Sequence, residues 1–158
     1  MIGTTAGTTE RTAGEAEGFA RILLASEGRA IPRSAIDRVV ELARPGAEVR
    51  VLSIARVHGV GFALPAPGLM PTKREWQEQR DIVAKAIAGL KRRGLRADGH
   101  VLGTRKAAKR ICEEAALTGS EAIVMAADPD RGRVRGDMMW TQEPQRVRRR
   151  AKVPVFLV

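Results

Sequence analysis

Short apolar runs alternate with amphipathic segments along most of this chain. Near-continuous apolar stretches at 19–25, 49–55, 121–126 and 153–158 are typical of strands that are buried on both faces of a sheet, and a weaker stretch covers 96–102. The segments between them carry apolar residues at helical spacing. This alternation predicts one α/β domain, a Rossmann-like five-stranded parallel sheet with helices on both faces.

Capping and turn residues bound the predicted helices. Thr72 to Glu75 is a capping box. Pro144 suits the first turn of a helix, because the N–H that proline lacks has no partner there. The predicted helices run from Pro32 to the Pro45–Gly46 turn, from Lys73 to about Gly94, from an N-cap at Thr104 to Gly119, and from Thr141 to Arg150.

Two segments lack such a pattern. Residues 1–18 are rich in Thr, Gly, Ala and Glu and cannot bury enough apolar surface to offset their ordering entropy, so we predict a disordered tail and a domain over 19–158. Residues 56–71 are a long connection with several Pro and Gly. A connection of this length in a small domain is usually a functional flap or a mobile segment.

Composition narrows the class of protein further. Only 3% of the residues are aromatic and there is no Tyr, so the core must be aliphatic. The single cysteine, Cys112, excludes an intrachain disulfide and a thiolate-rich zinc site, which fits a reducing cytosol. His58 and His100 do not share a ligand spacing, so we expect no metal site. No apolar run reaches transmembrane length, and we expect a cytoplasmic protein.

The net charge of +10 favours anionic partners such as a nucleotide or a nucleic acid. Basic runs occur at 91–93, 105–110 and 146–152. Aromatic residues that could stack on bases are scarce, so any nucleic-acid binding should be non-specific. Solvated helix faces are the interpretation that we favour for these runs.

The candidate site lies after the fourth strand. Ligands of open α/β sheets bind outside the carboxyl ends of the strands, where a loop leads into a helix N-terminus. The loop after Met125 has this position, and it contains three cations that could hold a phosphate by bidentate contacts. The residues of this basic loop are Arg131, Gly132, Arg133, Arg135 and Gly136.

These segments resemble the universal stress protein family. Its members typically read IVMG where this chain has Ala122 to Ala126, and APCPVLVV where it has 151–158. The first strand and its turn are similar to the family's ILVAVDGSE, but Glu27 replaces the Asp and Arg29 replaces the Ser. The resemblance covers 19–158 and implies a fold like that of the adenine-nucleotide α-hydrolases. It also implies nucleotide contacts at Ala25, Ser26, Glu27, Gly28, Met125 and Ala126.

The family's phosphate loop, G-x2-G-x9-G-S/T, is poorly matched. Counted from Met125, its first two glycines fall on Ala126 and Pro129; counted back from the tail, its last Gly and Ser fall on Thr141 and Gln142. Proline has no N–H to donate, and a phosphate cradle needs glycine so that the backbone can approach closely. We therefore predict a degenerate loop that does not bind ATP in the family's usual mode.

The function predicted from these features is a non-enzymatic regulatory or stress-response module. No Ser–His–acid or similar catalytic pattern is present, and no cofactor is certain, although ATP or another adenine nucleotide is the ligand class open to it. One alternative is a nucleotide-binding switch that uses the basic loop, and another is a module that binds nucleic acid or another polyanion. The uncharged apolar strand at 153–158 predicts a homodimer, because an exposed edge of this kind favours pairing.

Overall fold

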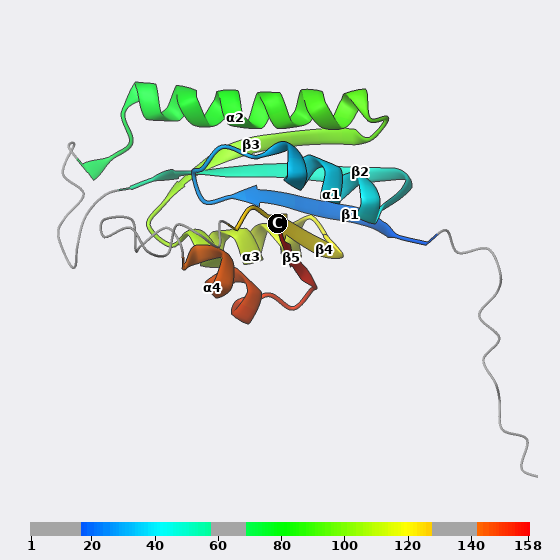
Figure 1. The fold of residues 1–158 in the computed structure, drawn as a ribbon. Helices are drawn as coiled ribbons and strands as arrows, with labels where there is room; N and C mark the ends of the chain where they lie inside the picture. The colour runs from blue at the N-terminus through cyan, green and yellow to red at the C-terminus, as the bar shows by residue number, and fades with distance from the viewer. Residues whose placement is uncertain (1–16, 58–68, 128–141) are drawn as a thin grey trace, which may run out of the picture.

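The computed structural model describes residues 17–57, 69–127 and 142–158. Five strands form one parallel sheet in the order β3-β2-β1-β4-β5, which confirms the predicted fold class (Figure 1). Most of the predicted tail and of the 56–71 connection lies outside the described residues. The elements are β1 (Phe19–Ser26), α1 (Arg33–Leu42), β2 (Ala43–Arg56), α2 (Lys73–Arg92), β3 (Arg96–Thr104), α3 (Ala107–Leu117), β4 (Ala122–Met125), α4 (Glu143–Arg150) and β5 (Val155–Leu157).

Helices cover both faces of the sheet. α1 and α2 lie on one face, and α3 and α4 lie on the other (Figure 1). Successive side chains of a strand point to opposite faces. Leu23 and Ala25 of β1 therefore join the core beneath α3 and α4, whereas Ile22 and Leu24 join the core beneath α1 and α2. All four side chains are buried, and the fully buried core is aliphatic, as the composition predicts.

The second strand begins earlier than predicted. α1 ends at Leu42, and β2 starts at Ala43, which pairs with Phe19 of β1. The Pro45–Gly46 turn therefore lies within β2, at an irregularity of the β1–β2 pairing. The residue before a proline is disfavoured in the α conformation, and Gly46 has a φ of 76°. Pro45 and Gly46 thus lie at the interruption of the β1–β2 pairing, which is regular again from the Arg21–Glu48 pair onward.

The start of the third helix was also predicted wrongly. Thr104 belongs to β3, where it pairs with Arg56 of β2, and its hydroxyl accepts the Lys106 N–H at 3.0 Å. α3 begins at Ala107, with Lys106 as its N-cap residue. By contrast, the capping box of α2 is confirmed, because Thr72 accepts the Glu75 N–H at 3.2 Å and the Glu75 side chain accepts the Thr72 N–H.

The last strand, β5, lies at one edge of the sheet and β3 at the other. β5 is shorter than the predicted 153–158 and comprises Val155–Leu157. Pro154 lacks an N–H, but its carbonyl accepts the Ile123 N–H of β4 at 2.9 Å. Strand order thus places β1 at the centre, with the loops after β1 and β4 side by side.

Candidate functional site

The strand order reverses between β1 and β4, where a doubly wound sheet opens a crevice for ligands. Ala25 near the end of β1 is paired with Met125 at the end of β4. The predicted residues after β1 and those after β4 therefore meet at the same carboxyl edge. The described ones among them are Ala25, Ser26, Glu27, Gly28, Met125 and Ala126.

The turn after β1 is held by its own hydrogen bonds. The Ser26 hydroxyl donates to the Arg29 carbonyl and accepts the Gly28 N–H, which lies 3.1 Å away. Gly28 has a φ of 122°, a conformation that favours glycine. Gln79 of α2 donates to the Gly28 carbonyl at 3.0 Å and accepts from Ser53. The Ser26 hydroxyl is therefore engaged inside the turn.

Arg29 links this turn to the loop after β4. Its guanidinium pairs with the carboxylate of Glu27, which is only 1% exposed. The same guanidinium donates to the Ala126 carbonyl at 3.5 Å, near the limit of a hydrogen bond. Arg29 therefore spans the two loops between which a ligand at this crevice would lie. The Glu27 carboxylate is therefore both buried and already paired with a cation.

A second set of charges lies where β2 and α3 meet α4. The buried carboxylate of Glu143 accepts the Ala108 N–H, in the first turn of α3, at 3.1 Å and an Arg146 N–H at 2.9 Å. Burial lowers the pKa of Arg56, at the end of β2, while the carboxylates of Glu143 and Glu27 raise it. In the described part of this edge, each of these arginines thus lies near at least one carboxylate.

Comparison with known proteins places this architecture in a family. The model of the universal stress protein family matches residues 18–158. The chain belongs to the universal stress protein family. A comparison with curated protein sequences gives no match.

Solved structures of universal stress proteins share the fold. One from Archaeoglobus fulgidus is 17% identical with a TM-score of 0.66, and the match covers 89% of this chain and 93% of that one. A structure from the same organism in complex with dAMP is 19% identical with a TM-score of 0.63, covering 87% and 95%. Another universal stress protein, in complex with cAMP, is 14% identical with a TM-score of 0.61, covering 89% and 97%.

The loop that carries most of the predicted phosphate contacts is not described. Arg131, Gly132, Arg133, Arg135, Gly136 and Thr141 lie outside the described residues. Gln142 is the N-cap residue of α4, and its side-chain oxygen accepts an Arg146 N–H at 3.2 Å. The site of this universal stress protein is therefore described on its β1 side and at the start of α4.

Sequence reasoning missed four polar side chains at this edge: Arg29, Arg56, Gln79 and Glu143. The sequence did contain a signal that Arg29 belongs to the site, because Arg29 replaces a small residue typical of the family. Gln79 had none, since its partner Gly28 is 51 residues away along the chain. Glu143 precedes Pro144 at the start of a predicted helix, but its bond to α3 depends on how the two helices pack.

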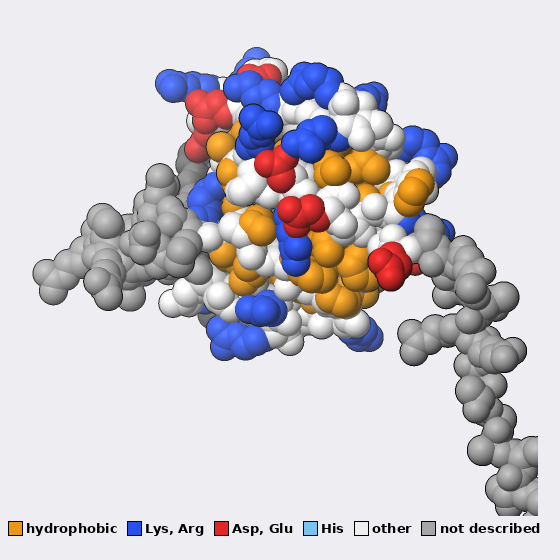
Figure 2. Space-filling view, turned by 45° about the vertical axis from the view of Figure 1, so that its right-hand side comes forward, with side chains coloured by type: hydrophobic (Ala, Val, Ile, Leu, Met, Phe, Trp, Pro, Cys, Tyr) orange, Lys and Arg blue, Asp and Glu red, His pale blue; other side chains and the backbone are white. Residues whose placement is uncertain are grey.

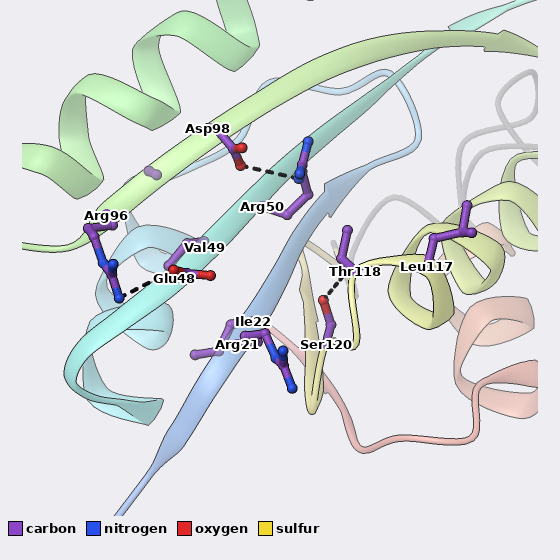
Figure 3. A pocket seen from close by; sticks show the side chains of 11 residues that line it. Arg21, Ile22, Glu48, Val49, Arg50, Arg96, Asp98, Leu117, Thr118 and Ser120 are labelled. Carbon is purple, nitrogen blue, oxygen red and sulfur yellow. Dashed lines mark hydrogen bonds and ion pairs between the residues drawn. The ribbon is translucent and has the colours of Figure 1, made fainter.

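A separate polar cavity of about 400 Å³ lies at the opposite, amino end of the sheet (Figure 3). It exists because the 11 residues of α3 extend roughly 16 Å and leave the first halves of β1 to β3 uncovered on this face. Two ion pairs line it, Arg50–Asp98 at 3.2 Å and Arg96–Glu48 at 3.3 Å. Most of its charges therefore already have partners.

The far wall of this cavity is the turn after α3. Thr118 and Ser120 are hydrogen-bonded to one another at 2.7 Å (Figure 3). The Thr118 hydroxyl also donates to the Glu114 carbonyl at 2.9 Å. The guanidinium of Arg21 extends beside Gly119, close to the carboxyl end of α3, where the helix dipole favours a cation. We therefore interpret Arg21 as a residue that stabilises the turn after α3.

The described residues contain no group of three or more His, Cys, Asp and Glu side chains that could hold a metal ion. Among the described helices, none is both long and apolar enough to cross a membrane.

The surface carries charges of both signs. Figure 2 shows Lys and Arg side chains interspersed with Asp and Glu around exposed apolar groups. Ion pairs between neighbouring turns of a helix include Arg38–Glu41 at 2.9 Å and Arg110–Glu113 at 3.0 Å. These helix-surface pairs agree with the interpretation that many of the basic residues lie on solvated helix faces.

Proposed function

We propose that this universal stress protein is a non-enzymatic, cytoplasmic regulatory module of the stress response with a degenerate nucleotide site. Family membership supports the regulatory role. Structures of related folds in complex with dAMP and with cAMP support an adenine nucleotide as the ligand class. The single cysteine is compatible with the reducing cytoplasm.

The main observation that supports a degenerate nucleotide site is the position of Arg29. Its guanidinium pairs with the buried Glu27 and donates to the Ala126 carbonyl, so it bridges the two loops of the crevice. A nucleotide entering between these loops must displace Arg29 and leave the Glu27 carboxylate without its cation. Leaving a buried charge unpaired is costly, so the bridge opposes binding.

The test restores the residues that are typical of the family. We expect wild-type protein, freed of carried-over ligand, to bind AMP, cAMP and ATP with a Kd of about 1 mM or weaker. The double variant Glu27→Asp with Arg29→Ser removes the bridge, and we expect it to bind at least one of the three at least tenfold more tightly. Isothermal titration calorimetry measures both.

Arg33→Ser is the matched control, because Arg33 is an exposed arginine in the first turn of α1 whose ion pair is with Asp37 of the same helix. It should bind as weakly as the wild type. Micromolar ATP binding by the wild type would contradict the degenerate site. A folded double variant that binds no better than the control would contradict the role of Arg29.

Two alternative functions are distinguished by related titrations. If the protein is a nucleotide switch that uses Arg131, Arg133 and Arg135, the wild type would bind ATP. The triple variant with Ala at these three positions would not bind it. A polyanion-binding module would use the exposed cations of α4, among them Arg148 and Arg149. Its affinity for duplex DNA would be independent of sequence and would fall steeply as salt is added.

We further propose that the protein is a homodimer that pairs through β5. This strand is an edge of the sheet, and Val155–Leu157 carry no charge. Unpaired N–H and C=O groups along such an edge favour pairing with a second copy about a two-fold axis.

A further inference from the structure

A groove of about 380 Å³ lies between α3 and the segment that leads from α4 to β5. Two features of the sequence create it. The last turns of α3 and the turn after it carry small residues here, Ala115, Ala116 and Gly119, and α4 ends at Arg150, so neither helix fills the space. Gly119, Ser120 and Val153 place the groove toward the amino end of β4, away from the crevice that Arg29 bridges.

The inner surface of the groove is mainly apolar. Ile123 of β4 is fully buried at its floor, and Val153 and Ala151 form the wall on the β5 side. Cys112 lies on the α3 side, half-buried, with its Sγ 3.9 Å from the Val147 carbonyl. Burial raises the pKa of the Cys112 thiol, whereas the charge of Arg150 lowers it. A concave, largely apolar surface of this size suits the body of a small organic molecule.

Cations surround this apolar surface. Lys109, Arg150 and Lys152 line the groove together with one acid, Glu113. Glu113 is engaged by two cations, Lys109 at 3.6 Å and Arg110 at 3.0 Å. Arg150 and Lys152 form no ion pair with any residue in the described part of the chain. The local charge is therefore positive at one end of an apolar surface.

The groove between α1 and α2 provides a comparison. It has about 470 Å³ and is lined by Arg33, Arg92 and Arg93 with Ile31 and Ile36. There, however, the Asp37 carboxylate pairs with two of the cations, with Arg33 at 3.8 Å and with Arg93. Lys85 and Arg92 also line that groove and are not paired with Asp37. The α3–α4 groove is therefore distinguished by its apolar surface together with Arg150 and Lys152, and not by its cations alone.

We infer that the α3–α4 groove binds a small amphipathic anion, a carboxylate with an aliphatic or aryl body. The body lies on Ala116, Ala151 and Val153, and Arg150 and Lys152 hold the carboxylate. Burial of the apolar body supplies affinity, and the cations supply selectivity for the charge. This site is independent of the proposed nucleotide crevice, and its test does not depend on whether a nucleotide binds.

The test uses probes that separate charge from apolar surface. Decanoate has both an apolar chain and a carboxylate charge, decanol has only the chain, and acetate has only the charge. Decanoate is used below the concentration at which it forms micelles. We expect calorimetric binding of decanoate that is at least tenfold tighter than that of decanol, and no measurable binding of acetate. Decanoate should also slow the reaction of Cys112 with a thiol reagent, because the thiol lines the groove.

Two variants test the assigned residues. The double variant Arg150→Glu with Lys152→Glu should weaken decanoate at least tenfold, whereas Lys91→Glu with Arg92→Glu, at the end of α2, should leave it unchanged. Ala116→Trp fills the groove from an exposed position and should abolish binding, while Ala88→Trp, exposed on α2, should not. Circular dichroism confirms that each variant is folded.

Three results would overturn the inference. Decanol that binds as tightly as decanoate would show a purely apolar pocket. Undiminished binding by both folded groove variants would place decanoate elsewhere. Protection of Cys112 by inorganic polyphosphate equal to that by decanoate would show a basic surface without a site for the chain.

Discussion

At the scale of single residues, close backbone approach decides where glycine is needed. Gly99 of β3 is paired with Val51 of β2. A Cβ at Gly99 would overlap the Val51 carbonyl oxygen and lie 2.9 Å from the Val51 Cβ, distances that packed atoms do not tolerate. Gly89 in α2 differs, because a Cβ there meets its nearest atom, on Ile36, at 3.9 Å, an ordinary contact.

We therefore expect Gly99→Ala and Gly89→Ala to change stability in opposite directions. Gly99→Ala forces the β2 and β3 backbones apart and should reduce the free energy of unfolding by about 1–3 kcal/mol. Gly89→Ala should raise it by up to about 1 kcal/mol, because alanine loses less backbone entropy in a helix. Urea unfolding measures both, and equal effects of the two variants would contradict this account.

At the scale of elements, α3 receives its N-terminal cap from another helix. Its N-cap residue, Lys106, provides no side-chain hydrogen bond. Instead the buried carboxylate of Glu143, at the start of α4, accepts the Ala108 N–H at 3.1 Å. An acid at this position also complements the dipole of α3. Glu143 thereby joins the two helices of one face, and its Arg146 contact orients it.

Replacing Glu143 should cost more than replacing an exposed acid of α3. Glu143→Ala leaves a buried N–H without an acceptor and should reduce the free energy of unfolding by about 1–3 kcal/mol. Glu113→Ala is the control; it removes two exposed ion pairs, each worth at most about 1 kcal/mol.

Glu143→Gln separates the hydrogen bond from the charge. The amide oxygen of Gln can still accept the Ala108 N–H, so this variant should lie between wild type and Glu143→Ala in urea unfolding. Identical stability of Gln and Ala variants would show that the carboxylate charge, and not the cap, stabilises the helices.

At the scale of the whole molecule, the open edge of β5 determines how a second copy could pair. The Pro154 carbonyl accepts the Ile123 N–H of β4, and the Val158 N–H donates to the Met125 carbonyl at 3.0 Å. Because alternate residues of a strand face opposite sides of the ladder, the N–H and C=O of Val155 and Leu157 point to the open edge. Phe156 is already half-covered by Phe19 and Arg38, whose guanidinium lies 5.1 Å from the ring centroid.

We expect Leu157→Pro to dissociate the proposed dimer. Proline removes the N–H that faces the open edge but none of the bonds between β4 and β5. Leu157→Ala is the control, since it trims the same side chain and keeps the N–H. Solution mass by light scattering at high micromolar concentration should show a dimeric wild type and control and a monomeric proline variant. A monomeric wild type would contradict the dimer, as would a proline variant that stays dimeric.

The sequence by itself determined the α/β class, the order of the elements and the aliphatic core. These features depend on local signals: apolar runs such as 122–125, the Thr72 capping box, and glycines at helix ends such as Gly94 and Gly119, both with positive φ. Element boundaries were less predictable at Leu42 and Thr104. In both places pairing with a neighbouring strand outweighed the local preference of the residues.

Only the tertiary structure decided which charges meet. Arg29, which is paired with Glu27, also contacts Ala126 because β4 lies beside β1, although the carboxyl ends of these two strands are about a hundred positions apart in the sequence. The Glu143 cap on α3 and the groove beneath Arg150 likewise depend on how α3 and α4 pack. Hydrophobic patterning fixes which face of each element is buried, but it carries no information about which polar groups from distant elements then face one another.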